Sequence, residues 1–329
     1  MRITIFGAGA VGCHFAVRLG LGGNEVSVVV RGAQLAAITR SGLTLEFGAE
    51  TLRFSAKASD NAAELGKQDL VIVTLKAHAQ PAAAKAIREL LATDTPVIFA
   101  QNGIPWWLPH ACANRTAGTT KVGTWPDLGF LDPDGELLSQ VGLARTLGGV
   151  VTSANSIVAP GIVRADPPRR PQLAIGEIHG ARSARVDRIR AVLEDSGIGS
   201  PAVADISSEI WGKLVRNLSA SSLALLTERN SSIVQEDAAV GDISSALIAE
   251  IESIAQAGGF DTGGMSARAI ELLKQAPSRF PSLLQDRLAG RRLETDSLFK
   301  APQTMARALG VKTPVFDIIT ALVIALSDR

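Results

Sequence analysis

The sequence predicts an α/β domain with a doubly wound, mostly parallel sheet, followed by an all-α domain. In the first half of the chain, apolar strand-like runs alternate with helical stretches, which is the pattern of a parallel sheet with crossover helices. A cluster of glycines directly follows the first of these strands. After Asp205, apolar residues recur at helical period without a strand pattern. We therefore expect two domains, at residues 1–204 and 205–329.

The first residues predict a β-α-β unit. Arg2–Phe6 is a short run rich in β-branched residues, Val11–Leu19 is amphipathic, and Glu25–Val30 is a second apolar run. Strand, turn, helix and strand fit within about 30 residues, as such a unit requires. Gly32–Arg40 then predicts a helix, and the alternation from Leu43 to Ala56 predicts a hairpin.

Further strands extend the predicted sheet. Leu70–Leu75 is a continuous apolar run, as expected of a central strand covered on both faces. Gln80–Leu91 predicts an alanine-rich helix, and Pro96–Ala100 predicts the next strand. From about Gly148 to Ile178, short strand-like pieces lie among prolines and predict antiparallel additions to the sheet. These pieces are Gly149–Thr152, Ile162–Arg164 and Leu173–Ile175.

Helical segments account for the remainder of the chain. Ala181–Ser196 predicts a helix that ends at Gly197. The segments that predict the all-α domain are Ile206–Leu226, Ile243–Gln256, Ala267–Leu273, Glu294–Leu309 and Val315–Leu326.

Composition and charge argue against several classes of protein. Lys plus Arg number 33 against 32 Asp plus Glu, and a net charge of +1 argues against a nucleic-acid partner. Cys13 and Cys112 form no disulfide framework, which favours a reducing, cytoplasmic compartment. No apolar stretch is long enough to span a membrane, and the N-terminus does not resemble a signal peptide. No spacing of histidines and carboxylates suggests a metal site.

The glycine cluster predicts a dinucleotide-binding turn of the Rossmann type, G-x-G-x-x-G. Its residues are Gly7, Ala8, Gly9, Ala10, Val11 and Gly12. The first glycine allows the sharp turn, the second lets the backbone approach a pyrophosphate, and the third lets helix and strand pack closely. The pyrophosphate then lies at a helix N-terminus, where the dipole favours an anion. The alternative is a glycine-rich turn without a ligand, against which the flanking strand and helix argue.

Arg31 favours NADP over NAD as the cofactor. NAD enzymes usually place Asp or Glu about 20 residues after the glycines, where it holds the ribose 2′-hydroxyl. Here Arg31 stands at the end of the second strand. A guanidinium can bind a 2′-phosphate in a fork, whereas a carboxylate would repel it. Arg40 is a second candidate, and a solvated arginine at a strand end is the alternative.

Six blocks of sequence, taken together, resemble one known family. They are GAGAVG with VVVRG, Val73–Ala77, Gln101–Trp107, Val158–Gly161, Trp211–Leu214 with Asn217, and Ser282–Asp286 followed by Gly290-Arg291 and Glu294–Asp296. With these blocks the chain resembles the ketopantoate reductase (2-dehydropantoate 2-reductase) family along nearly its whole length. The first block is common to many families, whereas the fifth and sixth, in this order and spacing, are specific.

The resemblance implies reduction of a small-molecule 2-keto acid by NADPH, with ketopantoate as the substrate on the route to pantothenate and coenzyme A. It implies that Lys213 is the catalytic lysine and that Glu294, which we group with it, binds the substrate. Family members occur as monomers and dimers, and we favour a homodimer through the helical domain. The further implied positions are Asn217, Ser282 and Asn102 for the substrate, and Asn102 and Lys76 for the cofactor.

The chemistry agrees with these positions. Hydride arriving at a ketone carbon leaves charge on the oxygen, which a lysine ammonium can stabilise and protonate. Lys213 and Asn217 are four residues apart and share one helix face, which we expect at an interdomain cleft. Burial near other cations would lower the pKa of Lys213, and Glu294 could orient it. The alternatives are a surface pair for Lys213 and Glu294, a turn residue for Asn102 and a solvated strand end for Lys76.

Two positions depart from the family pattern on the substrate side. Ser221, which we count among the substrate-binding residues, stands where many members have a second Asn. Serine cannot offer the paired donor and acceptor of an amide. Arg279 stands where some members carry an Asn near the substrate. These departures leave open a reductase of another branched or larger 2-keto acid. Two further alternatives are a non-catalytic NADP-binding sensor, against which Lys213 and Glu294 argue, and a relative of the 6-phosphogluconate and hydroxyacid dehydrogenases, which would carry a different lysine motif.

Overall fold

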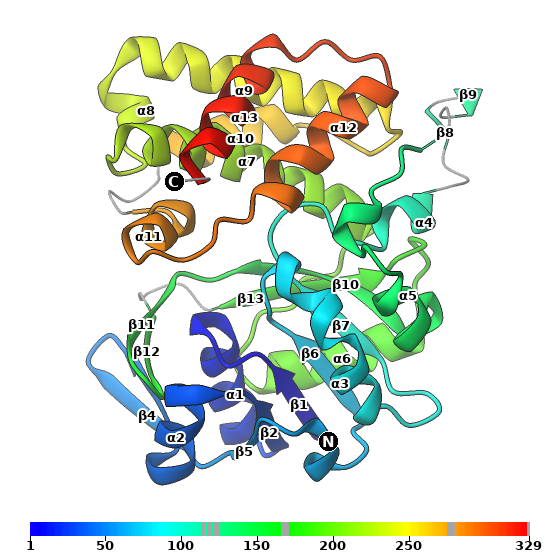
Figure 1. Ribbon diagram of the computed structural model, residues 1–329, viewed down its shortest axis with the longest axis vertical. Coiled ribbons are helices and arrows are strands. Elements are labelled where there is room, and N and C mark those ends of the chain that lie inside the picture. Colours follow the sequence, from blue (N-terminus) through cyan, green and yellow to red (C-terminus); the bar gives the residue numbers. More distant parts are fainter. Residues whose placement is uncertain (113–115, 118–119, 122–124, 166–170, 275–279, 328–329) are drawn as a thin grey trace. The chain divides into compact units, whose positions relative to one another are not determined.

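The computed structural model divides the chain into two compact units (Figure 1). It describes residues 1–112, 116–117, 120–121, 125–165, 171–274 and 280–327. Unit 1 consists of Met1–Gln101 and Asp132–Ile206, and unit 2 consists of Asn102–Leu131 and Ser207–Arg329.

Residues 102–131 belong to unit 2, whereas the sequence pattern predicts a single boundary after residue 204. The cause is bonding to residues far along the chain. The N–H of Ile104 donates to the carbonyl of Ser297 at 2.8 Å. The ring of Trp125 lies edge-on to that of Phe260, with centroids 5.7 Å apart. The separate roles expected for the two domains stay a prediction.

Unit 1 is built on a seven-stranded sheet with the order β13-β10-β7-β6-β1-β2-β5. The strands are β1 Arg2–Phe6, β2 Glu25–Val29, β5 Lys57–Ser59, β6 Leu70–Val73, β7 Val97–Ala100, β10 Thr146–Thr152 and β13 Gln172–Glu177. Every neighbouring pair is parallel except β10 with β13. The chain adds β2 on one side of β1 and later β6 on the other, so the order reverses beside β1. The predicted doubly wound, mostly parallel sheet is confirmed.

A second sheet of four strands, in the order β11-β12-β3-β4, forms another layer of unit 1. Its strands are β3 Leu43–Phe47, β4 Glu50–Phe54, β11 Asn155–Ala159 and β12 Ile162–Ala165. The antiparallel pairing of β3 with β4 confirms the predicted hairpin. The predicted antiparallel additions to the main sheet are right for β13 alone, because β10 is parallel to β7 and β12 pairs with β3. Val163 of β12 is fully buried in the core of unit 1, which accounts for its place in this layer.

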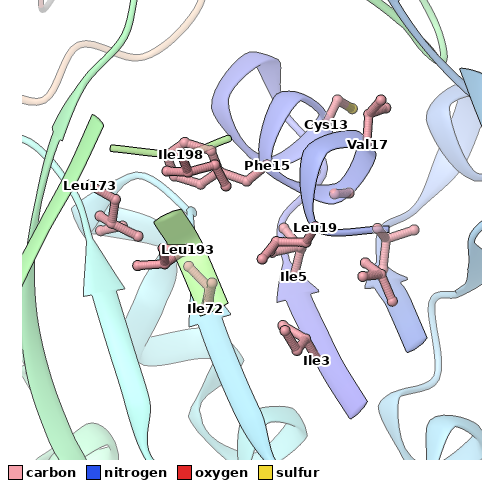
Figure 2. Close-up of a cluster of buried hydrophobic side chains, with 14 of the residues drawn as sticks. Ile3, Ile5, Cys13, Phe15, Val17, Leu19, Ile72, Leu173, Leu193 and Ile198 are labelled. Carbon is pink, nitrogen blue, oxygen red and sulfur yellow. The ribbon is translucent and has the colours of Figure 1, made fainter. Parts of the chain in front are cut away.

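Helix α1 (Ala10–Leu21) lies between the two sheets. It contacts β1 and β2 of the main sheet and β3, β4, β11 and β12 of the second. Phe15 and Leu19 are fully buried, and Figure 2 shows them in one cluster with Ile3 and Ile5 of β1. A helix covered on both sides must be apolar over most of its surface. Helix α1 is therefore buried on more than the single apolar face that the amphipathic sequence pattern predicts.

The other helices of unit 1 are α2 Gly32–Ser41, α3 Gln80–Glu89, α5 Glu136–Gln140 and α6 Ala184–Asp195. Three of them, α2, α3 and α6, are predicted by the sequence. Helix α6 begins where the hydroxyl of Ser183 accepts a hydrogen bond from the N–H of Val186 at 3.2 Å. It ends before Gly197, whose φ of +75° is a conformation that favours glycine.

The regular secondary structure described in unit 2 is helical apart from the short pair β8 (Thr116–Ala117) and β9 (Thr120–Lys121). The helices are α4 Leu108–Cys112, α7 Ile206–Thr227, α8 Ile233–Glu236, α9 Ala238–Ala257, α10 Met265–Lys274, α11 Ser282–Leu288, α12 Ala301–Ala308 and α13 Pro314–Ser327. Helix α9 contacts α8, α10, α12 and α13 and so occupies the middle of the unit. The predicted all-α part after Asp205 is confirmed for the described residues. None of the described helices is long and apolar enough to cross a membrane.

The predicted helical segment Glu294–Leu309 is helical without interruption from Thr295 to Ala308, but its first part is not a regular α-helix. A π-helical turn over Asp296–Lys300 precedes α12. Pro302 explains the irregularity, because proline lacks an N–H and its ring would clash with the carbonyl of Leu298 in a regular α-helix. Glu294 itself directly precedes the first helical residue, Thr295, and is buried.

Gly12→Ala should destabilise unit 1. The added Cβ would lie 2.1 Å from the carbonyl oxygen of Gly7, so α1 would have to move away from β1. We expect the free energy of unfolding to fall by about 1–3 kcal/mol, as for other overpacked sites. Urea unfolding followed by circular dichroism measures this change.

Gly9→Ala is the matched control for that substitution. Its Cβ would meet no atom of the described residues within 4 Å, so the free energy of unfolding should change by less than about 0.5 kcal/mol. Equal destabilisation by the two variants would contradict the close contact described at Gly12.

Candidate active site

The turn between β1 and α1 has the shape that a pyrophosphate requires. Gly7 has a φ of +105°, which glycine adopts without strain. A Cβ at Gly12 would lie 2.1 Å from the Gly7 carbonyl oxygen and 2.6 Å from the Thr74 hydroxyl oxygen, so only glycine permits this approach of helix to strand. At Gly9, no atom of the described chain lies within 4 Å of the position that a Cβ would take, which leaves room for a ligand there.

Helix α1 begins at this turn without a side-chain cap. Its N-cap residue is Gly9, and among the described residues no side chain caps the first turn with a hydrogen bond. Ala8, Ala10 and Val11 complete the turn and add no charge. Backbone N–H groups and the positive end of the helix dipole attract an anion at such a position. The turn therefore fits the pyrophosphate of a dinucleotide.

Arg31 and Lys76 lie at the same edge of the main sheet as the glycine turn. Gly7 follows β1, Arg31 follows β2 and Lys76 follows β6. These three strands are parallel neighbours, so their carboxyl ends share one edge. Arg31 is exposed at the N-cap of α2, and Lys76 is half-buried. Their contact with a cofactor stays a prediction.

Two residues that the sequence patterns do not single out also contact the glycine turn. The hydroxyl of Thr74 donates to the carbonyl of Gly7 at 2.5 Å. The side-chain amide of Gln34 donates to the carbonyl of Ala8 at 3.2 Å. Thr74 lies in a block that resembles the family, which is a signal that could have found it. Gln34 has no local signal, because its contact depends on how α2 packs.

Lys213 lies on α7, in surroundings that disfavour the positive charge of its side chain. Burial lowers the pKa of Lys213 to about 8, and the Arg216 guanidinium contributes in the same direction, whereas the Glu294 carboxylate acts to raise it. Arg216 is one helical turn further along α7 and shares the side on which Lys213 lies. The expected lowering of the pKa is therefore found, and Arg216 is a neighbour that the sequence patterns do not single out. A lysine with such a pKa can release a proton near neutral pH.

Glu294 links Lys213 to the loop after β7. Its carboxyl is buried, with 6% of the residue exposed. The side-chain amide of Asn102 donates to Glu294 Oε2 at 3.4 Å. Gly103 has a φ of +76°, and a Cβ there would lie 2.5 Å from the carbonyl oxygen of Ser297. Glycine is thus required where this loop passes the segment after Glu294, and Asn102 is held beside the carboxylate.

The remaining substrate-site candidates are less closely grouped. Asn217 and Ser221 follow Lys213 at intervals of four on α7, so the three share one face of the helix, and both are half-buried. Ser282 is exposed at the first position of α11, and no described hydrogen bond joins it to Glu294 or Lys213. Arg279 lies outside the described residues.

Comparison with known proteins agrees with this fold. The family model for ketopantoate reductase PanE/ApbA matches residues 3–106, and the model for the C-terminal part of that family matches residues 205–327. A 2-dehydropantoate 2-reductase from Mesorhizobium japonicum is 35% identical over 324 residues, which cover 98% of this chain and 97% of that protein.

Solved structures share the fold over the whole chain. The crystal structure of 2-dehydropantoate 2-reductase from Geobacter metallireducens has a TM-score of 0.84 at 23% identity, and it covers 99% of each chain. A structure of D-mandelate dehydrogenase with NADH and anilino(oxo)acetate has a TM-score of 0.83 at 20% identity, covering 100% of this chain and 98% of that one. Fold and sequence together define the class, that of oxidoreductases acting on CH–OH groups. The chain belongs to the ketopantoate reductase family.

Two substitutions should move the pKa of Lys213 in opposite directions. Glu294→Gln removes a negative charge and should lower this pKa below about 8, whereas Arg216→Gln removes a positive charge and should raise it. NMR titration of the lysine side-chain carbons measures both shifts.

Arg229→Gln is the control, because Arg229 is an exposed residue of the same unit that pairs with Glu236. It should leave the titration of Lys213 unchanged. Shifts of the same sign for Glu294→Gln and Arg216→Gln would contradict the electrostatic account of the site.

Proposed function

We propose that the chain is an NADPH-dependent 2-dehydropantoate 2-reductase that reduces ketopantoate to pantoate. The observation that carries this proposal is the group formed by Lys213, Glu294 and Asn102. It combines an amine whose pKa lies at about 8 with a buried carboxylate that accepts a hydrogen bond from an amide. The 35% identity to a 2-dehydropantoate 2-reductase over nearly the whole chain supports the same substrate.

Each part of the group has a chemical role in reducing a ketone. The ammonium of Lys213 stabilises the charge that develops on the ketone oxygen and then donates its proton to that oxygen. Glu294 accepts a hydrogen bond from the substrate hydroxyl, and its charge favours the protonated form of Lys213. The residues that would complete the substrate site are Asn102, Asn217, Ser221 and Ser282.

The cofactor would be held by the glycine turn together with Arg31, Lys76 and Asn102. When bound, NADPH supplies the hydride. Gly7, Gly9 and Gly12 shape the turn that takes the pyrophosphate, and Arg31 takes the 2′-phosphate of the adenosine ribose. Preference for NADPH over NADH rests on this arginine, since no carboxylate follows β2 at that point.

Ser221 supports a second candidate, a reductase of a different 2-keto acid. Its side chain is shorter than the Asn found in many members of the family and lies on the same helix face as Lys213. A shorter side chain leaves more room and one hydrogen-bonding group fewer. A branched or larger 2-keto acid would fit this change.

The proposal extends to the setting of the enzyme. Pantoate production places it on the route to pantothenate and coenzyme A, in the cytoplasm, without nucleic-acid or membrane partners.

We further propose a homodimer through the helical unit. Helix α13 presents Ile318 and Leu322, which are 62% and 51% exposed and lie one turn apart. Sedimentation velocity measures the oligomeric state directly.

Lys213→Ala should abolish reduction of ketopantoate, followed as the loss of NADPH absorbance. Without the proton donor, kcat should fall by about 10²–10⁴. Lys213→Arg should not restore activity, because a guanidinium keeps the charge but does not release a proton. In the unmodified enzyme, kcat/KM should be constant below pH of about 8 and fall above it, since only protonated Lys213 is active.

Lys85→Ala is the control for loss of a lysine, because the Lys85 side chain is 76% exposed in unit 1. It should retain full activity. Faster turnover of another 2-keto acid than of ketopantoate would favour the second candidate function, a reductase of a different 2-keto acid. Retained activity in Lys213→Ala would overturn both candidate functions.

Arg31→Ala should lower the preference for NADPH. Loss of the bidentate contact to the 2′-phosphate removes a charge-assisted interaction, so KM for NADPH should rise about tenfold or more. KM for NADH, which lacks that phosphate, should change little. Steady-state kinetics with both cofactors measures the ratio, and an unchanged ratio would show that another group selects the cofactor.

A further inference from the structure

We infer that Gln34 is a positioning residue that orients the peptide between Ala8 and Gly9 for the dinucleotide. The inference rests on the proposed use of the glycine turn as a cofactor site. It adds a residue from α2 that does not itself touch the pyrophosphate, and it gives a role to the Val158–Gly161 block.

The side-chain amide of Gln34 forms two hydrogen bonds whose directions fix its orientation. Its Nε2 donates to the carbonyl of Ala8 at 3.2 Å. Its Oε1 accepts from the N–H of Gly161 at 2.5 Å. Because a backbone N–H can only donate, Oε1 must face Gly161, and the amide nitrogen must therefore face Ala8.

The carbonyl of Ala8 is held from two sides. The thiol of Cys13 donates to it at 3.2 Å, in addition to Gln34. In a planar trans peptide the C=O and the N–H point in opposite directions. The N–H of Gly9 belongs to the same peptide as the Ala8 carbonyl, so it points away from Gln34 and Cys13. Gly9 borders the open space beside the turn, which is where an anion would be bound.

The neighbouring peptide is held in the same manner. The hydroxyl of Thr74 donates to the carbonyl of Gly7 at 2.5 Å, which directs the N–H of Ala8 the opposite way. Side chains from α2, α1 and the end of β6 thus bind consecutive carbonyls of the turn. Their common effect is to present N–H groups before a ligand arrives, which lowers the cost of binding.

Gly161 anchors Gln34 to the second sheet. Its φ of +77° is a conformation that favours glycine, and its own carbonyl accepts from the N–H of Thr44 at 2.8 Å. A Cβ at Gly161 would lie 3.3 Å from the carbonyl oxygen of Gly42. A continuous series of hydrogen bonds therefore runs from Thr44 through Gly161 and Gln34 to Ala8.

The test is dinucleotide affinity in two variants of the full-length protein. Gln34→Leu removes both hydrogen bonds, and Gln34→Glu keeps the acceptor for Gly161 but removes the donor to Ala8 and adds a negative charge. NADPH and NADH are titrated by fluorescence. For whichever dinucleotide binds more tightly, we expect Gln34→Leu to lower the affinity about tenfold and Gln34→Glu to lower it further. At saturating cofactor, kcat should be unchanged while KM for the cofactor rises.

A second ligand separates positioning from a merely structural role. Adenosine 2′-monophosphate lacks the pyrophosphate, so its affinity should be the same in Gln34→Leu and the unmodified chain. Equal losses for this ligand and for the dinucleotide would overturn the inference, as would no loss for either. Gln140→Leu is the matched control, since the Gln140 amide donates to the neighbouring Ser139 hydroxyl, away from the turn.

The outcomes also distinguish this inference from the proposed function. A selective loss of dinucleotide affinity in Gln34→Leu supports the inference even if the unmodified chain reduces no 2-keto acid. Turnover of ketopantoate with undiminished dinucleotide binding by Gln34→Leu overturns the inference alone. An unmodified chain that binds neither NADPH nor NADH overturns both.

Discussion

The contact between the start of α1 and the end of β1 is the constraint on which unit 1 depends. At Gly12 the helix backbone comes so close to the Gly7 carbonyl that no side chain fits. This approach fixes the direction of α1, which then has to pass between two sheets and bury Phe15 and Leu19. The same approach leaves the uncapped helix N-terminus at the carboxyl edge of the main sheet. A packing requirement and an anion site are thus two results of one contact.

The charge at Lys213 is set by three competing effects. Burial and the Arg216 guanidinium disfavour the ammonium, and the Glu294 carboxylate favours it, with burial the largest of the three. The balance leaves the pKa at about 8. The buried Glu294 carboxylate accepts a hydrogen bond from the Asn102 amide, and the close passage of Gly103 against Ser297 keeps Asn102 beside it. Acid–base behaviour at one amine therefore depends on a loop more than 100 residues earlier in the chain.

Local sequence predicts the parts of the structure that local interactions decide. The residues Arg2–Phe6 form β1 as expected, and the glycine spacing gives the turn with its positive φ. The helical period after Asp205 predicts α7, α9, α10 and α13 to within about five residues at each end, whereas the short helices α8 and α11 are not predicted. The family resemblance identifies Lys213, Glu294 and Asn102, which the structure brings together through an electrostatic interaction and a hydrogen bond.

Non-local pairing explains what the sequence does not predict. The partner of β12 and the place of residues 102–131 in unit 2 depend on contacts between segments far apart in the chain. Arg216 has no motif of its own, and its effect is visible only once the burial of Lys213 is known. Gln34 looks like an ordinary polar residue of a surface helix until its two hydrogen-bonding partners are known.

The thiol beside the glycine turn has a consequence for the chemical stability of the protein. Cys13 is fully buried, and burial raises the pKa of its thiol to about 12. Thiolate is the form that reacts with alkylating agents and peroxides, and at neutral pH almost none of it is present here. A hydrogen-bond donor must also keep its proton, so the environment that lets Cys13 support the turn protects it from oxidation as well. We expect the turn to keep its shape under oxidative conditions that would modify an exposed cysteine.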